Sequence, residues 1–220
     1  MDREDLKRAA AEAALAYVHD DEVIGVGAGT TTEHFIRALV RAPKRVRAAV
    51  AASERTRTLL EAHGVPVVGL SDELLPLRLY VDGADEADSR LGLIKGSGGA
   101  LTREKVVATA ARLFVCIVDE SKLVRDLGGV PLAVEVIPQA LYVVMRELAA
   151  MGGAVVLREE FETDNGNLLV DVEGLDFAEP TVLEMAINAI PGVVDNGIFA
   201  RRPADVLLVG TEGGIRTIER

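Results

Sequence analysis

Short apolar runs alternate with segments of helical periodicity along the first part of the chain. Apolar residues recur at helical spacing, and so predict helices, in residues 4–19, 30–41, 54–64 and 101–111. Runs rich in β-branched residues predict strands in residues 22–29, 46–52, 65–70, 77–82 and 112–119. Strands that alternate with helices in this order predict βαβ units and a mainly parallel sheet.

The pattern changes between residues 131 and 204. A short β-rich run, PLAVEVIP, precedes a predicted helix at residues 140–152, and two alternating runs flank the sequence TDNGN. The pair Asn165-Gly166 within TDNGN is a strong signal for a tight turn between antiparallel strands. Another helix is predicted at residues 180–190, where Pro180 suits the first turn. This block has the pattern of a smaller α+β lobe.

The last apolar run, ADVLLVGTEGG at residues 204–214, has the composition of a buried parallel strand, and we expect it to return to the first sheet. The fold prediction is therefore α/β: a Rossmann-like, mainly parallel sheet flanked by helices, with the smaller α+β lobe inserted before the last strand. The expected division is residues 1–130 plus 205–220 for the first domain and 131–204 for the lobe.

Composition narrows the possible partners and the compartment. The formal net charge is −11, which argues against nucleic acid and anionic membrane as partners. No run of about 18 uncharged apolar residues is present, so no membrane span is predicted. The charged start MDREDLKRAA lacks an apolar signal core, and Cys116 in the run RLFVCIVD is predicted to be a buried, inert thiol. We expect a cytoplasmic protein.

Lysine is scarce in this acidic chain. The lysines are Lys7, Lys44, Lys95, Lys105 and Lys122, and arginine supplies the other basic residues. An acidic, lysine-poor surface suits a solvent rich in salt, because screening weakens self-repulsion. A halophilic source is one hypothesis, and an ordinary acidic protein from a GC-rich genome is the alternative. A stability titration against KCl separates the two.

A glycine-rich loop, GVGAGTTTEHF, lies between a predicted strand and a predicted helix. This arrangement directs backbone N–H groups at an anion. A dinucleotide site would require glycine at position 30, where Thr30 stands, and no Walker-type Gly-Lys-Thr follows. The threonine hydroxyls suit a terminal phosphate. The alternative is a tight βα turn with a threonine as N-cap.

Two further segments carry candidate chemistry. In KGSGGALTREK, Lys95 precedes a glycine-rich turn and Glu104 falls in the first turns of a helix, so Lys95 could stabilise an oxyanion and Glu104 could act as a base. The alternative is a capped helix with an exposed charge run at residues 103–105. In DESKLV, Lys122 follows the strongest strand, at the sheet edge where α/β proteins bind ligands. A solvated loop lysine is the alternative there.

No metal site is predicted. The stretch LYVDGADEAD places four acids after a strand, but Ala84 breaks the alternation that a calcium loop needs. The residues His19, His34 and His63 are scattered without ligand spacing, and no Ser-His-Asp set or Gly-x-Ser-x-Gly motif is present.

Taken in order, these motifs resemble the type A ribose-5-phosphate isomerase family. The segments that carry the resemblance are GAGTTTEHFI, VDGADEAD, LIKGSGGALTREK and IVDESKLV, and the second lobe adds PLAVEVIP, TDNGNLLVDV and GVVDNGIFARRPADVLLVGT. The resemblance covers nearly the whole chain. It implies interconversion of D-ribose 5-phosphate and D-ribulose 5-phosphate, a step of the non-oxidative pentose phosphate pathway, with no metal or organic cofactor.

The resemblance also implies roles for individual residues. Glu104 would move the proton between C2 and C1, Asp82 and Asp85 would contact sugar hydroxyls, and Lys95 would lie near the enediolate oxygen. Lys7, Thr30, Thr31 and Lys122 would receive the phosphate. The family motifs further place Gly29, Gly83, Ala84, Gly96, Ser97 and Gly98 among the substrate-binding residues. A homodimer or homotetramer is implied, with the smaller lobe as a lid or oligomerisation element.

The residues support this chemistry independently. An aldose–ketose isomerase needs a carboxylate base, electrostatic stabilisation of an enediolate and remote contacts that orient the substrate. Two departures from the family pattern, Ala28 for threonine and Ser97 for glycine, bear on ligand contacts. The competing hypotheses are a non-catalytic sugar-phosphate sensor, a nucleotide-dependent enzyme and an acyl- or CoA-transferase-like protein. No basic DNA-binding segment, Gly at position 30 or candidate nucleophilic glutamate motif favours any of them.

Overall fold

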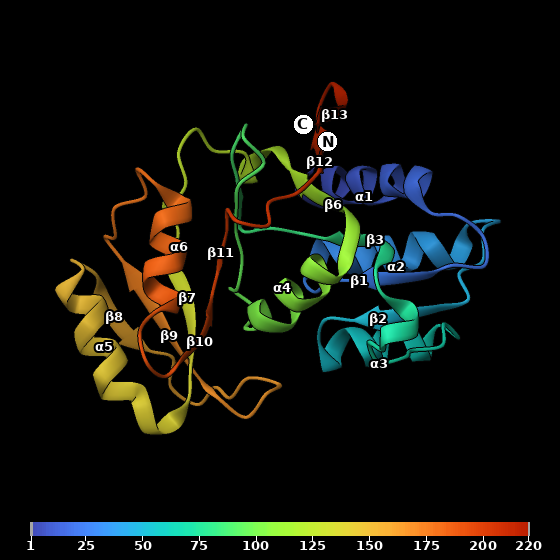
Figure 1. Ribbon diagram of the computed structural model, residues 1–220. Coiled ribbons are helices and arrows are strands. Elements are labelled where there is room, and N and C mark those ends of the chain that lie inside the picture. The colour runs from blue at the N-terminus through green and yellow to red at the C-terminus, as the bar shows by residue number, and fades with distance from the viewer. Residues whose placement is uncertain (1, 220) are drawn as a thin grey trace. The chain divides into compact units, whose positions relative to one another are not determined.

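The computed structural model describes residues 2–219 and divides the chain into two compact units. Unit 1 runs to Ala84, includes Arg103–Leu123 and resumes at Ala204, and unit 2 comprises Asp85–Thr102 and Val124–Pro203. The elements are labelled in Figure 1. Compared with the division expected from sequence, residues 85–102 and 124–130 lie in unit 2, and Ala204 lies in unit 1. One unit boundary therefore falls within the DGADE motif.

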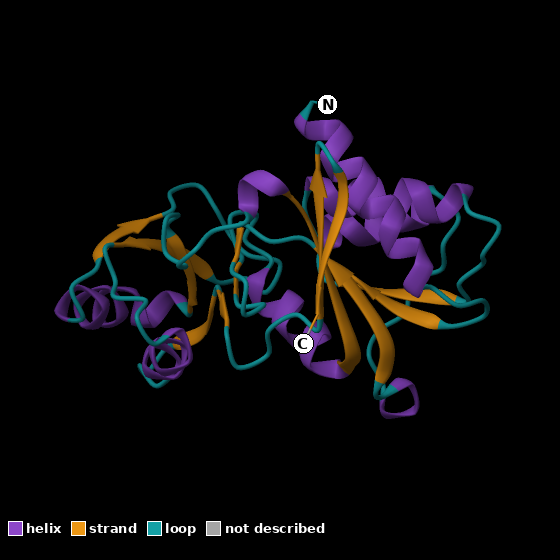
Figure 2. Cartoon of the chain, turned by 90° about the horizontal axis from the view of Figure 1, so that it is seen from above, coloured by secondary structure: helices purple, strands orange, loops and turns teal. Residues whose placement is uncertain are grey.

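Unit 1 contains a six-stranded sheet in the order β13-β12-β6-β3-β1-β2. Its strands are β1 (Val23–Val26), β2 (Ala48–Ala51), β3 (Leu77–Asp82), β6 (Ala111–Asp119), β12 (Val206–Thr211) and β13 (Gly214–Glu219). The first five pair in parallel, and β13 pairs antiparallel with β12. The strands fan out with the expected twist (Figure 2). The predicted mainly parallel sheet is confirmed, including the return of the last apolar run beside β6.

The helices of unit 1 match most of the predicted segments. They are α1 (Arg3–Ala13) with the 3-10 turn η1 (Ala14–Tyr17), α2 (Thr30–Arg41), α3 (Glu54–Ala62) and α4 (Leu101–Ala110), together with the 3-10 turns η2 (Asp72–Leu74) and η3 (Glu120–Lys122). The first helix starts with a capping box in which Asp2 accepts from the Asp5 N–H, and Asp5 reaches back to the Asp2 backbone. The unit boundary lies within α4, after Thr102.

Alternation along the strands divides the sheet into two faces. Ile24 and Val26 of β1 pack in one buried cluster with Leu79 and Val81 of β3 and with the apolar faces of α1 and α2. Gly25 points to the opposite face, where a Cβ would come within 2.5 Å of Val107 from α4 and 2.8 Å of Tyr80. Gly25 and its partner Tyr80 on β3 therefore lie on the face of the sheet that α4 covers.

Unit 2 contains two antiparallel sheets. The larger has the order β10-β7-β9-β8 and the smaller β11-β5-β4. The strands are β4 (Glu86–Ala87), β5 (Leu93–Ile94), β7 (Leu132–Val136), β8 (Ala154–Leu157), β9 (Leu168–Glu173), β10 (Val193–Asn196) and β11 (Ile198–Phe199), and the helices are α5 (Leu141–Ala150), α6 (Pro180–Asn188) and the 3-10 turn η4 (Pro138–Ala140). Apolar residues from β7, β9, α5 and α6 form its core. The predicted α+β pattern is confirmed for these residues.

Several local predictions were wrong. Residues 65–70 form no strand and make only an isolated bridge between Val67 and Ala49, because Pro66 lacks an N–H donor. The N-cap of α2 is Gly29, at φ 98°, so no threonine caps this helix. The predicted tight turn in TDNGN is present, because the Gly166 N–H donates to the Thr163 carbonyl and β8 and β9 pair antiparallel, although a loop of residues 158–167 separates the two strands. The hairpin partner β13 was not predicted at all.

Two predictions from composition can be compared with the structure. Cys116 is buried, as predicted. No helix within residues 2–219 has both the length and the apolar character that crossing a membrane requires.

Candidate active site

Three neighbouring strands of unit 1 end at the same edge of the sheet and carry candidate residues in the loops that follow. Residues 27–29 follow β1, residues 83–84 follow β3, and η3 with Lys122 follows β6. The pairing of Val26 with Val81 and of Asp82 with Cys116 brings these ends into register. After β1 the chain continues to β2 on one side of the sheet, and after β3 it continues to β6 on the other side. The point between β1 and β3 is therefore a topological switch point, where α/β sheets bind ligands.

Asp82 organises the loop after β1. Its side chain is 0% exposed, and its Oδ1 accepts hydrogen bonds from the Ala28 N–H at 3.0 Å and from the Gly83 N–H at 2.7 Å. The Thr32 hydroxyl also donates to this oxygen, at 3.3 Å. A Cβ on Gly27 would overlap the Asp82 carboxylate, so only glycine allows this approach. The structure thus unites the glycine-threonine loop with the first aspartate of the DGADE motif.

Tyr80 contacts Asp82 and lies near the negative charge of Glu104, and sequence reasoning missed it. The Tyr80 hydroxyl donates to Asp82 Oδ2. Burial, followed by the nearby negative charges of Asp82 and Glu104, raises the pKa of Tyr80 well above its ordinary value. Glu104 lies in the first turn of α4 and is 4% exposed, so the alternative of an exposed charge run is wrong for this residue. The i, i+2 spacing of Tyr80 and Asp82 on a strand was the signal available for predicting this contact.

The predicted phosphate residues of α1 and α2 are in contact. Lys7 Nζ donates to Thr30 Oγ1 at 3.1 Å and to Glu4 Oε1 at 2.7 Å. The other Glu4 oxygen lies 2.9 Å from His34 Nε2. The hydrogen bonds from Lys7 and then His34 lower the pKa of Glu4 to about 2. Lys7 is therefore paired with a carboxylate in the absence of ligand.

The remaining candidates of unit 1 lie at the same sheet edge. Gly29 is exposed at φ 98° with open space around it, and Thr31 is half-buried beside Gly83. Lys122 is half-buried in η3, which Asp119 caps by accepting from the Ser121 N–H at 3.0 Å. Burial would raise the pKa of Asp119, but hydrogen bonds from Ser121 and from Arg3 outweigh it and lower the pKa. The capped turn fixes the backbone that presents Lys122.

The candidate residues of unit 2 form a second cluster. Asp85 is half-buried and accepts from the Ser97 N–H at 2.9 Å and from the Ser97 hydroxyl at 2.6 Å. Ser97 thus supports Asp85 in this structure. The backbone of Lys95 donates to the Gly197 carbonyl at 2.9 Å, and its Nζ lies 5.8 Å from the centre of the Phe199 ring. Lys95 is 3% exposed, which holds its ammonium in a fixed place.

The loop that follows Lys95 is supported by residues that the sequence did not indicate. The Arg158 guanidinium donates to the Ser97 carbonyl at 2.9 Å and is held by Asp171 at 2.9 Å. The Phe161 ring occupies the position that a Cβ on Gly99 would take. Gly96 has φ 114°, and a Cβ there would lie 2.9 Å from Ala133 and Leu101. Gly96 and Gly99 of the KGSGG motif are therefore required by backbone conformation and close packing, whereas Gly98 has open space around it.

A buried carboxylate ties the start of α4 to the TDNGN turn. Glu135 of β7 is 0% exposed, and its oxygens accept from four side chains. The donors are Thr163 Oγ1 at 2.8 Å, Asn165 Nδ2 at 3.0 Å, Asn167 Nδ2 at 2.8 Å and Thr102 Oγ1. Thr102 stands two residues before Glu104 in α4. Glu135 therefore fixes the first turn of the helix that carries the proposed base.

The other acids of LYVDGADEAD have local structural contacts. Glu86 is buried and accepts from the Gly128 N–H at 2.8 Å, and Asp88 accepts from the Arg90 and Gly92 N–H groups at 2.9 Å. Within the part of the chain that the structure describes, no three His, Cys, Asp or Glu side chains are grouped as a metal site. That the reaction needs no metal stays a prediction.

Comparison with known proteins decides the family. The model of the family described as ribose 5-phosphate isomerase A (phosphoriboisomerase A) matches residues 48–214. A ribose-5-phosphate isomerase A of Legionella pneumophila (strain Corby) is 51% identical over 215 residues, which cover 98% of this chain and 99% of the relative. The chain belongs to the ribose 5-phosphate isomerase A family. It is an enzyme of the aldose–ketose isomerase class.

Solved structures of ribose 5-phosphate isomerases have the same fold. The enzyme from Neisseria gonorrhoeae has a TM-score of 0.97 at 47% identity, covering 99% of this chain and 97% of that one. A D-ribose-5-phosphate isomerase in complex with phospho-erythronic acid has a TM-score of 0.95 at 39% identity, with complete coverage of both chains. The resemblance noted in the sequence is confirmed at the level of family and fold.

Proposed function

We propose that this chain interconverts D-ribose 5-phosphate and D-ribulose 5-phosphate through an enediolate, with Glu104 as general base and without a metal. The burial of Glu104 in the first turn of α4, next to Tyr80, is the observation that supports this proposal. A carboxylate shielded from water in a preorganised site is suited to remove a carbon-bound proton. The family membership and the bound phospho-erythronic acid of one relative agree with a sugar-phosphate substrate.

The proposed reaction conserves protons. From the open-chain aldose, Glu104 takes the C2 proton, and the electrons move to the carbonyl oxygen O1 as the enediolate forms. A proton then passes from O2 to O1, and Glu104 returns its proton to C1, which gives the ketose. The Lys95 ammonium stabilises the negative oxygen electrostatically. Its near-complete burial means that little reorganisation is needed when charge develops.

The two aspartates are assigned different parts in handling the sugar hydroxyls. Asp85 is half-buried and is proposed to contact a hydroxyl directly, supported by Ser97. Asp82 is wholly buried. We propose that it acts on the sugar hydroxyls indirectly, by ordering the loop at Ala28. The motif positions Gly83, Ala84, Gly96 and Gly98 are proposed to lie along the substrate backbone, where small residues permit close approach.

The phosphate group is assigned to Lys7, Gly29, Thr30, Thr31 and Lys122. Thr30 and Thr31 begin α2, whose N-terminus favours an anion through its free N–H groups and dipole. Lys7 already contacts Thr30, and the substrate phosphate would compete with Glu4 for its ammonium. Such remote binding orients C1 and C2 toward the base.

A direct assay of ribose 5-phosphate conversion in the presence of EDTA tests the reaction. Glu104→Gln is expected to lower kcat by about 10³-fold, within the range for loss of a general base, while sugar-phosphate binding is retained. Glu61→Gln, on the exposed face of α3, is the matched control and should retain wild-type kcat. A near-wild-type rate for Glu104→Gln would reject Glu104 as base. Activity that disappears only when EDTA is added would refute the metal-free mechanism.

We also propose a homodimer or homotetramer that assembles through unit 2. Its helices α5 and α6 expose apolar side chains: Tyr142 is 83%, Val182 61% and Met185 53% exposed. Large apolar side chains that stay exposed in the single chain can be covered by association with a second copy. Light scattering on the purified protein is expected to show a dimer or tetramer. The double variant Tyr142→Glu/Val182→Glu is expected to show an assembly of lower mass. A monomeric wild type would contradict this assignment.

A further inference from the structure

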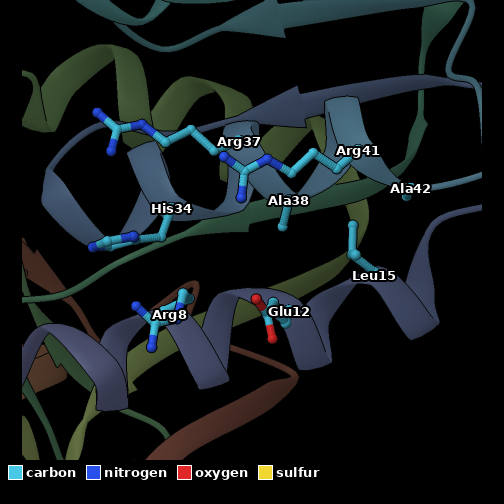
Figure 3. Close-up of a pocket in the computed structure, with 8 residues that line it drawn as sticks. All are labelled: Arg8, Glu12, Leu15, His34, Arg37, Ala38, Arg41 and Ala42. Carbon is cyan, nitrogen blue, oxygen red and sulfur yellow. The ribbon is translucent and has the colours of Figure 1, made fainter.

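A groove in unit 1 lies between α1 and α2 and has no part in the proposed catalytic chemistry (Figure 3). Its volume is about 400 Å³, within the range of small-molecule pockets. The lining residues are Arg8, Glu12, Leu15, His34, Arg37, Ala38, Arg41 and Ala42. We call it the α1/α2 groove.

The groove is cationic on an acidic protein. Arg8, Arg37 and Arg41 line it with the carboxylate of Glu12, whereas the whole chain has 35 acidic and 24 basic residues. Arg8 is paired with Asp5, so the excess positive charge of the groove comes from Arg37 and Arg41. Arg37 and Arg41 stand four residues apart on one helix, a like-charge spacing that weakens a helix by a few tenths of a kcal/mol. Among residues 2–219, neither guanidinium has an ion pair. Charge balance within the fold therefore does not account for this pair.

A second hollow adjoins the groove. Its volume is about 320 Å³, and Arg37, Val40, Arg41 and His63 line it. Arg37 and Arg41 line both hollows. Figure 3 shows that the Arg41 side chain extends along α2 in the direction of Arg37. A ligand with two anionic groups could use both arginines.

We propose that the α1/α2 groove binds a small organic phosphate that carries at least two negative charges. Guanidinium groups bind phosphate oxygens through paired N–H donors, which favours phosphate over a simple carboxylate. The Glu12 carboxylate can accept from a hydroxyl or amino group, and Leu15, Ala38 and Ala42 supply an apolar floor for an organic portion. The net charge of −11 disfavours a nucleic acid as the occupant.

This site is separate from the proposed substrate-phosphate residues but is connected to them. None of Lys7, Thr30, Thr31 or Lys122 lines the groove. His34, which does, shares the Glu4 carboxylate with Lys7, at 2.9 and 2.7 Å respectively. The proposal does not depend on the isomerase mechanism, because binding at the groove can be measured without turnover.

Isothermal titration calorimetry at low ionic strength, with ADP and inorganic pyrophosphate as probes, tests the proposal. The double variant R37A/R41A is expected to bind ADP at least about tenfold more weakly than wild type, because two charge-assisted contacts are lost. R112A/R216A removes the same charge from exposed positions outside the groove and should bind as wild type. Lys122→Ala should also retain ADP binding, which separates the groove from the substrate-phosphate residues.

Two further measurements keep the outcome unambiguous. The KM for ribose 5-phosphate of R37A/R41A should remain within about twofold of wild type, and thermal unfolding should show that the variant is folded. If the double variant is unfolded, Arg41→Gln alone replaces it, with several-fold weaker ADP binding expected. Equal ADP binding by R37A/R41A and wild type, or no binding by wild type, would overturn the proposal. Binding of pyrophosphate without ADP would refute the organic-phosphate assignment.

Discussion

Replacing Glu135 tests how the proposed base is positioned. In Glu135→Ala, the hydroxyls of Thr102 and Thr163 and the amides of two asparagines lose their acceptor. A hydrogen bond to a charged group contributes about 1.5–3 kcal/mol, and truncating one partner of a buried ionic network costs about 3–5 kcal/mol. Because Asn165 is exposed and its amide can turn to water, we expect a loss of about 4 kcal/mol in the free energy of unfolding.

Glu135→Gln should be much milder, and the geometry gives the reason. Oε1 receives three of the donors, at 2.8, 3.0 and 2.8 Å, so a glutamine carbonyl placed there retains them. The new NH2 group would then face Thr102 Oγ1, a hydroxyl that can reverse its role and accept. We expect a loss of about 1 kcal/mol, mainly from the lost charge.

Urea denaturation followed by circular dichroism measures both values. Glu173→Ala, at an exposed position of β9, is the matched control and should lie within about 0.5 kcal/mol of wild type. Because Thr102 lies in the first turn of the helix that carries Glu104, Glu135→Ala should also lower kcat more than it raises KM. Equal stability of the alanine and glutamine variants would refute the argument, since it would mean that Oε1 does not hold the three donors.

Three further predictions concern unit 1. Gly27→Ala should reduce kcat/KM at least about tenfold, because the methyl group would overlap the Asp82 carboxylate, whereas Gly69→Ala, with open space around it, should be neutral in the same assay. Tyr80→Phe should lower the free energy of unfolding by roughly 2 kcal/mol in urea denaturation, since it removes a hydroxyl donor to a buried carboxylate, and an unchanged midpoint would contradict this. The pKa of Glu4 is lowered to about 2 in the folded state, so its contribution to stability is present above the ordinary value of 4.5 and is lost as pH falls toward 2. Glu4→Gln should remove that part of the pH dependence of unfolding, and an identical profile for variant and wild type would refute it.

Periodicity predicted the elements whose burial is simple. The helix at residues 30–41 and the strand at residues 77–82 were predicted with the bounds that the structure has, because each has one strongly apolar face or run. The segment at residues 65–70 has the same apolar composition, but Pro66 leaves it with a single bridge. Strand β13 is largely exposed and so offered no apolar signal. Composition cannot show which of two similar runs will find a pairing partner.

The candidate residues were predicted one by one, but most of their contacts were not. Local motifs marked Asp82 and Glu104, since each lies next to a glycine turn or a helix start, whereas Lys7 was assigned only through the family resemblance. The Glu135 network joins residues that are about 30 positions apart in the sequence, and no local pattern signals that they meet. Arg158 is similar, because its contact with the Ser97 carbonyl depends on the path of the loop after β8.

The two aspartates of the DGADE motif illustrate why spacing alone could not assign roles. Asp82 is the last residue of a buried strand, so its carboxylate is taken from water and must be satisfied by the N–H groups of Ala28 and Gly83. Asp85 follows the two small residues 83 and 84, lies beyond the strand and stays half-buried. Its carboxylate accepts from the N–H and the hydroxyl of Ser97. A buried and saturated carboxylate costs much to disturb, whereas a half-buried one can exchange a protein donor for a ligand hydroxyl. The same residue type, three positions apart, therefore orders the backbone at one end of the motif and, at the other, is the residue that we propose contacts a substrate hydroxyl.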